Sequence, residues 1–76
     1  MVLQYVKDTL KIYLEEQTQE AYREFWDASY AFLSDYCTSP DEIEKFLDND
    51  MYPELDENMD FDLTIETIQA FAESFV

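Results

Sequence analysis

Glycine and histidine are absent from this sequence, and only four Lys and Arg residues oppose nineteen Asp and Glu. Without glycine, no turn has the residue that adopts positive φ at little cost, which disfavours two-residue hairpins and glycine helix stops. Without histidine, the commonest general base is missing, and neither a Ser–His nor a Cys–His catalytic pair can form. A glycine-rich phosphate loop is excluded as well. We therefore expect a mostly helical protein that is not an enzyme and needs no cofactor.

Cysteine is nearly absent too, because Cys37 is the only one. An internal disulfide is therefore impossible, and a zinc site lacks ligands. A lone thiol in a small domain is typical of a reducing compartment.

Polar residues from Gln4 to Lys11 interrupt the apolar runs near the N-terminus, so we expect no signal peptide. No segment approaches the ~18 apolar residues of a membrane span. These features predict a cytoplasmic protein.

Hydrophobic residues are plentiful, at 47% of the 76 residues, and 17% are aromatic. A disordered acidic tail is poor in aromatic residues, so this composition favours a folded chain. The length allows one small domain, which we expect to span residues 1–76.

Apolar residues recur at helical spacing in several segments. The sequence predicts a mainly α fold, a single small domain of three to four helices at about 2–16, 18–36, 40–48 and 62–75, with an acidic loop at 48–62. The positions expected to face the core are Val2, Leu3, Val6, Leu10, Tyr13, Leu14, Ala21, Phe25, Ala28, Phe32, Tyr36, Ile43, Phe46, Leu47, Ile65, Ile68, Phe71, Ala72 and Phe75. Tyr22, Trp26 and Leu33 are expected to flank the core stripe of the second helix. Leu55, Met59 and Phe61 are expected to anchor the loop.

Local signals place the helix boundaries. One helix over residues 2–36 would be about 52 Å long, which is awkward in so short a chain, so we expect a break at 15–19 with Thr18 as the next N-cap. A short hairpin turning at residues 7–8 is the alternative for the N-terminal segment.

The clearest boundary is Ser39-Pro40, where serine can cap, proline suits the first helical position and Glu42 completes a capping box. Asp62 or Thr64 is expected to cap the last helix.

The net charge is unusual: a formal −15, of which −11 falls in residues 41–76. Such a charge disfavours compactness through self-repulsion, repels nucleic acid and anionic membranes, and attracts basic partners. Solubility or adaptation to high salt is the alternative explanation.

The acidic segment 48–62 has three possible roles: metal loop, linker or charged surface. Asp56, Asn58 and Asp60 match positions 1, 3 and 5 of a calcium loop, but Phe61 replaces the required glycine and Thr67 the bidentate glutamate. We therefore expect no metal site. The apolar anchors argue against a purely solvated linker. The third role, a charged surface that binds a partner, is therefore the one we expect for this segment.

Carboxylates also recur at helical spacing outside this segment. Glu16, Glu20, Glu24 and Asp27 would form one row if a helix ran through them, and a second row follows on the next helix. The residues predicted to bind a partner are Glu16, Glu20, Glu24, Asp27, Tyr30, Asp41, Glu44, Asp48, Asp50, Tyr52, Glu54, Asp56, Glu57, Asp60 and Asp62. Alternatively, the rows are ordinary solvated faces, and Tyr30 belongs to the core.

Duplex DNA presents one phosphate about every 3.4 Å along each strand, and proteins bind it by replacing its counterions. Rigid rows of carboxylates can offer a similar field, and exposed tyrosines add contact area. In size, charge and predicted fold, the chain resembles the small acidic inhibitors that phages and mobile elements use against restriction or CRISPR nucleases.

The sequence thus suggests an inhibitor of a basic nucleic-acid-binding or nuclease complex. We expect the inhibitor itself to bind neither nucleic acid nor membrane, and its oligomeric state is left open. An immunity protein or antitoxin neutralising a basic toxin is the first alternative, and a structural adaptor is the second.

Overall fold

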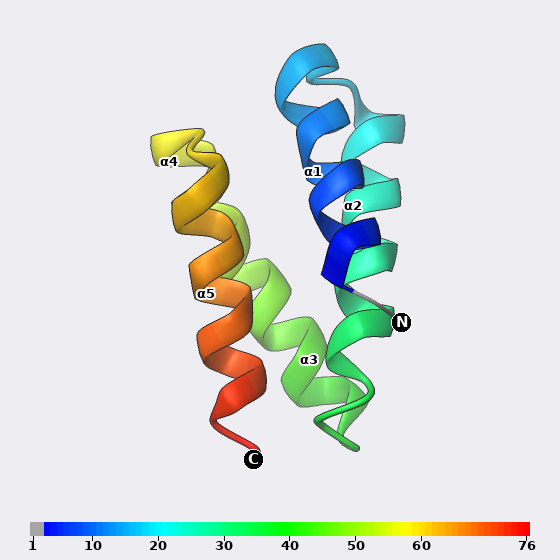
Figure 1. Ribbon diagram of the computed structural model, residues 1–76, viewed down its shortest axis with the longest axis vertical. Helices are drawn as coiled ribbons and strands as arrows, with labels where there is room; N and C mark the ends of the chain where they lie inside the picture. Colours follow the sequence, from blue (N-terminus) through cyan, green and yellow to red (C-terminus); the bar gives the residue numbers. More distant parts are fainter. Residues whose placement is uncertain (1–2) are drawn as a thin grey trace.

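The computed structural model describes residues 3–76, and it is helical almost throughout (Figure 1). The elements are α1 (Leu3–Glu16), α2 (Gln19–Leu33), α3 (Pro40–Phe46), the π-helical segment η1 (Leu47–Met51), α4 (Tyr52–Asn58) and α5 (Phe61–Glu73). Because α3, η1 and α4 follow one another without a break, they form one continuous rod, which we call the acidic rod. The mainly α prediction of three to four helices is confirmed. Val2, assigned above to the first helix and the core, lies outside the described residues.

The hairpin of α1 and α2 turns where the sequence predicted a break. Gln17 adopts a left-handed conformation with φ of 53°, and its amide donates to the Tyr13 carbonyl oxygen. Thr18 then caps α2, with its Oγ1 accepting from the Ala21 amide at 3.1 Å. A residue other than glycine therefore supplies the positive φ that ends α1, and the alternative hairpin at residues 7–8 is wrong because α1 runs through it.

The acidic rod begins at the predicted cap. Ser39 Oγ accepts from the Glu42 amide at 3.4 Å, and Pro40 occupies the first turn of α3. The Glu42 side chain accepts from Cys37 Sγ at 3.7 Å, so it also holds the segment that precedes the helix.

The predicted acidic loop at 48–62 is wrong, because most of this segment is helical. Met51 and Leu55 are fully buried, and with Leu47 they repeat every four residues as a helix requires. Pro53 lacks an amide hydrogen, and its ring would clash with the Asn49 carbonyl group in a regular α-helix. The chain widens into η1 just upstream, where the Tyr52 amide donates to the Leu47 carbonyl oxygen five residues back. The proline thus widens the helix locally without ending it.

The link between the acidic rod and α5 is short. Met59 has a φ of 48° and its amide donates to the Leu55 carbonyl oxygen, which closes α4. Asp60 Oδ1 accepts from the Leu63 amide at 2.9 Å, so Asp60 caps α5 in place of the predicted Asp62 or Thr64.

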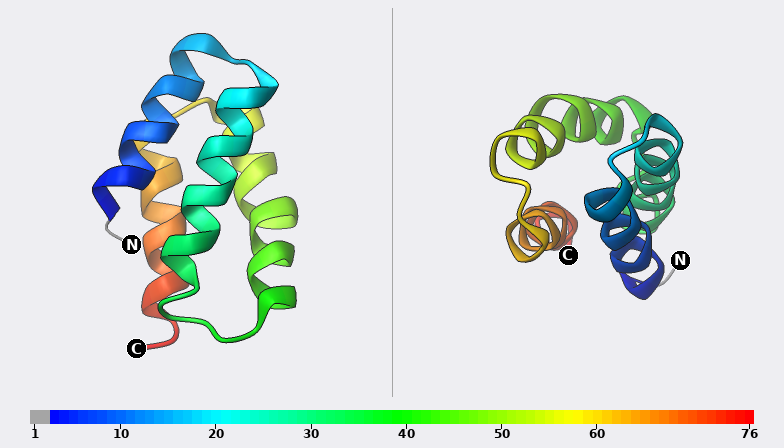
Figure 2. Two further views of the ribbon diagram at one scale, coloured as in Figure 1. Left: turned by 90° about the vertical axis from the view of Figure 1, so that its right-hand side faces the viewer. Right: turned by 90° about the horizontal axis from the view of Figure 1, so that it is seen from above.

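Seen from above, α1, α2, the acidic rod and α5 follow one another around the core in chain order, and α5 returns to contact α1 (Figure 2).

Most predicted core positions are buried or packed against the core, but Tyr36 and Phe75 are each 41% exposed. Both lie at or beyond the end of their helix, where the helical spacing no longer sets their direction. Cys37 and Met51 are buried without having been predicted. The core residues are Val6, Leu10, Phe25, Ala28, Phe32, Leu33, Cys37, Ile43, Phe46, Leu47, Met51, Leu55, Ile65, Ile68 and Ala72.

Candidate partner-binding surface

Five aromatic side chains, Tyr13, Tyr22, Trp26, Tyr30 and Tyr52, form an aromatic row across α1, α2 and the acidic rod. The Tyr22 ring meets the Tyr13 and Tyr52 rings edge to face, with centroids 5.4 and 5.3 Å apart. The Trp26 and Tyr30 rings are stacked, with a 5.6 Å separation and a 20° interplanar angle. Tyr22, Trp26 and Tyr30 are four residues apart on α2, so the helix itself aligns them. The row joins parts of the chain that are distant in sequence.

Trp26 also connects α2 to η1 directly. Its Nε1 donates to Asp48 Oδ1 at 3.1 Å. Asp48 remains exposed, so its carboxylate both fixes the indole ring and belongs to the surface. The π-helical turn therefore carries a side chain that orients the centre of the aromatic row.

Two shallow depressions lie along the row and share Gln19 and Tyr22. The first has a volume of about 660 Å³ and is lined by Gln19, Glu20, Tyr22, Arg23, Trp26 and Asp27. The second is lined by Tyr13, Gln17, Thr18, Gln19, Tyr22, Asp48 and Tyr52. Rings and carboxylates thus line two adjoining depressions together.

Folding raises the pKa of two phenols of the row, Tyr22 and Tyr13. Burial raises the pKa of Tyr22 well above its ordinary value of 10, and the nearby Asp48 carboxylate raises it further. Burial also raises the pKa of Tyr13, with smaller contributions from Tyr52 and Asp56. These side chains offer rings and hydroxyl groups, while the carboxylates supply the charge.

The predicted carboxylates are mostly exposed, but the first predicted row is divided. Glu16 ends α1, whereas Glu20, Glu24 and Asp27 lie on α2, because the chain breaks at residues 17–18. The single row from 16 to 27 is therefore wrong. The predicted residues that are exposed on the acidic rod are Asp41, Glu44, Asp48, Asp50, Tyr52, Asp56 and Glu57.

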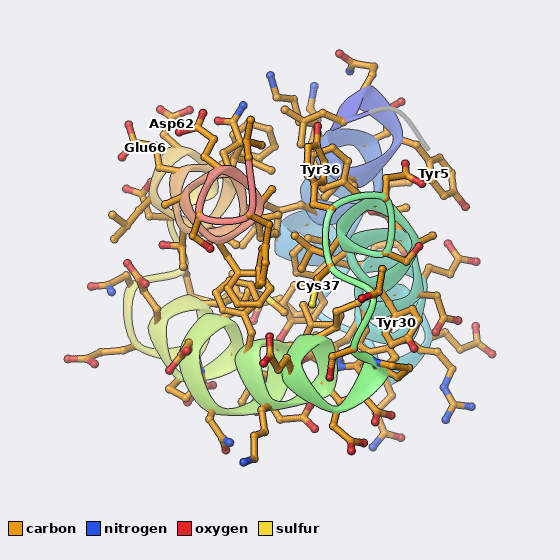
Figure 3. The ribbon with its side chains drawn as sticks, turned by 90° about the horizontal axis from the view of Figure 1, so that it is seen from below. Tyr5, Tyr30, Tyr36, Cys37, Asp62 and Glu66 are labelled. Carbon is orange, nitrogen blue, oxygen red and sulfur yellow. The ribbon has the colours of Figure 1, made fainter. Side chains whose placement is uncertain are left out.

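The fold brings together the carboxylates of the second predicted row, which lie on the acidic rod. Asp41, Glu44 and Asp48 line one shallow depression with Lys45 and Asn49 on the outer side of the rod. Asp62 is exposed in the first turn of α5, on the opposite side of the molecule from Tyr30 (Figure 3).

Two of the predicted site residues make hydrogen bonds that stabilise the fold. Glu54 is half-buried, and its Oε2 accepts from Thr67 Oγ1 at 2.9 Å, which ties α4 to α5. Asp60 caps α5. Both carboxylates stabilise the scaffold directly.

Sequence reasoning found Tyr30 and Tyr52 but assigned Tyr22 and Trp26 to the flank of a core stripe. All four rings are partly exposed, Tyr52 by 40%. The spacing of 22, 26 and 30 was a usable signal for one aromatic stripe on α2. The contact of Tyr52 with that stripe depends on tertiary packing.

Two other kinds of site were tested on residues 3–76. Within that range, no group of three or more Cys, Asp or Glu side chains is placed to hold a metal ion. Asp56 and Asn58 lie in α4 while Asp60 caps α5, so they do not form the calcium-loop arrangement. None of the described helices is long and apolar enough to cross a membrane.

Comparison with protein-family models, with curated proteins and with solved structures gives no match for this chain. Its function must be inferred from the surface itself. That surface combines exposed carboxylates on every helix with the aromatic row between α2 and the acidic rod.

Proposed function

We propose that this protein is a non-enzymatic inhibitor that occupies the basic DNA- or RNA-binding groove of a partner protein, with carboxylates in place of phosphates. Charge arithmetic supports this. Even if all four basic side chains paired fully, a net charge of −15 would remain uncompensated. Such an excess steers basic partners toward the surface and raises their association rate.

The observation that carries the proposal is the charge density of the acidic rod. Between Pro40 and Asn58 the chain has eight carboxylates and one base, Lys45. At 1.5 Å per residue, the rod is about 28 Å long and carries roughly one net negative charge per 4 Å. One DNA strand carries a phosphate about every 3.4 Å. The linear charge of the rod therefore approaches that of a nucleic-acid strand.

Rigidity supports the proposal as well. The acidic segment is helical rather than a loop, and Met51 and Leu55 fix it to the core. Its charges thus have set positions before any partner arrives, which lowers the entropy cost of association. A surface that served only solubility would need neither the rod nor the exposed rings.

The test begins with affinity capture from cell lysate on the immobilised protein at low and high salt. The captured protein is then purified, and its binding to duplex DNA or RNA is titrated with increasing inhibitor. We expect mutually exclusive binding that weakens steeply with salt. A complex in which nucleic acid stays bound, or a partner surface without positive charge, would overturn the proposal. The first of these results would favour neutralisation of a toxin by an immunity protein.

Two charge-matched variants localise the effect. In the first, Asp41, Glu44 and Glu57 of the acidic rod become amides; in the second, Glu15, Glu66 and Glu73 do so. Each variant loses three of the nineteen acidic charges. We expect the rod variant to lose at least about tenfold in affinity and to show a shallower salt dependence, while the second keeps most of its affinity. Equal losses would show that only total charge matters.

A further inference from the structure

We infer that the aromatic row recognises arginine side chains of the basic partner in preference to lysine side chains. This inference rests on the proposed function and adds the chemistry of the contact. The net charge of the acidic rod would attract either cation. The aromatic row adds flat rings beside carboxylates, a combination that suits a planar guanidinium group.

The first contact lies at the stacked pair. The Trp26 and Tyr30 rings are stacked and both are partly exposed, and Trp26 lines the first depression. Asp27 follows Trp26 in the chain and lines the same depression. A guanidinium group stacked on these rings can donate two hydrogen bonds to a carboxylate from the same plane. A lysine ammonium group is a compact, strongly hydrated point charge without that planar fork.

The second contact lies in the neighbouring depression. Tyr22 and Tyr52 meet edge to face there, and Asp48 lies beside them. Because both depressions share Tyr22, an extended partner segment can place one arginine in each.

The chain itself supplies a guanidinium group at the first contact. Arg23 lines the depression with Trp26 and with the carboxylates of Glu20 and Asp27. Among the described residues, its charge is the one positive charge in a depression otherwise lined by rings, carboxylates and Gln19. At short range that charge repels a partner's arginine.

Trp26 is the only tryptophan, so its fluorescence reports binding at the aromatic row. The experiment titrates the full chain with hexa-arginine and, separately, with hexa-lysine at one fixed ionic strength. We expect hexa-arginine to bind about five- to thirtyfold more tightly, as two partly exposed cation–π contacts imply. Arg23→Gln is expected to tighten hexa-arginine binding at least about twofold, since it removes one positive charge from the depression.

Matched variants separate the rings from the total charge. Tyr52→Leu is expected to bring the ratio of the two affinities toward one, whereas Tyr5→Leu, at a tyrosine 46% exposed on α1, leaves it unchanged. Asp27→Asn should weaken hexa-arginine binding more than Glu66→Gln, which removes the same charge from α5 on the far side from Tyr30 (Figure 3). All four positions are exposed, and circular dichroism checks that each variant stays folded.

Equal affinities for the two peptides, or equal effects of Tyr52→Leu and Tyr5→Leu, would overturn the arginine preference. In that case, steep salt dependence and competition with nucleic acid at the captured partner would leave the proposed function standing. If neither peptide binds and no basic partner is displaced from nucleic acid, the proposed function fails and this inference with it.

Discussion

Met51→Ala tests whether the acidic rod is a fixed part of the fold. Met51 lies in η1 with no exposed surface, between Leu47 and Leu55 in the core. Shortening a fully buried methionine to alanine costs about 2–5 kcal/mol through lost burial and the cavity left behind. A domain of this length has a total unfolding free energy of about 4–11 kcal/mol. The substitution should therefore remove a large part of the stability of the whole protein.

The assay is unfolding in urea followed by far-ultraviolet circular dichroism, with the midpoint and slope compared between variants. Met59→Ala is the matched control, because Met59 is only half-buried and lies in the link after α4. We expect the control to lose less than about 1 kcal/mol. If Met51→Ala also lost less than about 0.5 kcal/mol, as a loop residue would, the rod would not be fixed in advance. The charges of the rod would then not be preorganised for a partner.

Three other substitutions test individual features of the fold. Gln17→Gly should raise the unfolding free energy by about 0.5–1 kcal/mol in urea titrations because glycine relieves the left-handed backbone, whereas Gln69→Gly within α5 should lower it by about 1 kcal/mol. Ser29→Ala should stabilise by about 1 kcal/mol in the same assay, because the buried Ser29 hydroxyl makes no hydrogen bond to the described residues; a loss of stability would reveal a partner. Since the pKa of Tyr22 is raised by folding, the unfolded chain ionises first, near pH 10, and stability should fall as pH rises above that value. Tyr22→Phe should show a smaller loss between about pH 9 and pH 11, and an equal loss would refute the assignment.

Helix boundaries set by short-range chemistry could be predicted from the sequence. Thr18 and Ser39 each cap a helix through an amide three residues on, which a local pattern reveals. The α5 cap was missed by two residues because Asp60, Asp62 and Thr64 are all plausible caps and the choice depends on where the preceding helix ends.

The part of the acidic rod after residue 48 was missed because its acidic residues and Pro53 outweighed its apolar repeat. Leu47, Met51 and Leu55 follow at four-residue intervals, a helical signal within a highly charged segment. A proline usually ends a helix, but the π-helical turn accommodates this one. Apolar spacing was therefore the better guide in this segment.

The candidate surface could be predicted only in part. Exposed carboxylates follow from their places opposite the core, and most of them lie where expected. The aromatic row depends on η1 packing beside α2, which brings Tyr52, the first residue of α4, to Tyr22 across thirty residues of sequence. No local pattern in one sequence encodes that contact.

Cys37 gives a means to time local opening of this domain. Cys37 lies in the connection between α2 and α3 and is 4% exposed, and its Sγ lies 3.6 Å from the Ser39 carbonyl oxygen. A soluble disulfide reagent can reach it only after that connection separates from the core, so the labelling rate follows the opening equilibrium. A partner seated across α2 and α3 would slow the labelling. The natural thiol of Cys37 thus makes the kinetics of local opening and of complex formation measurable without an engineered cysteine.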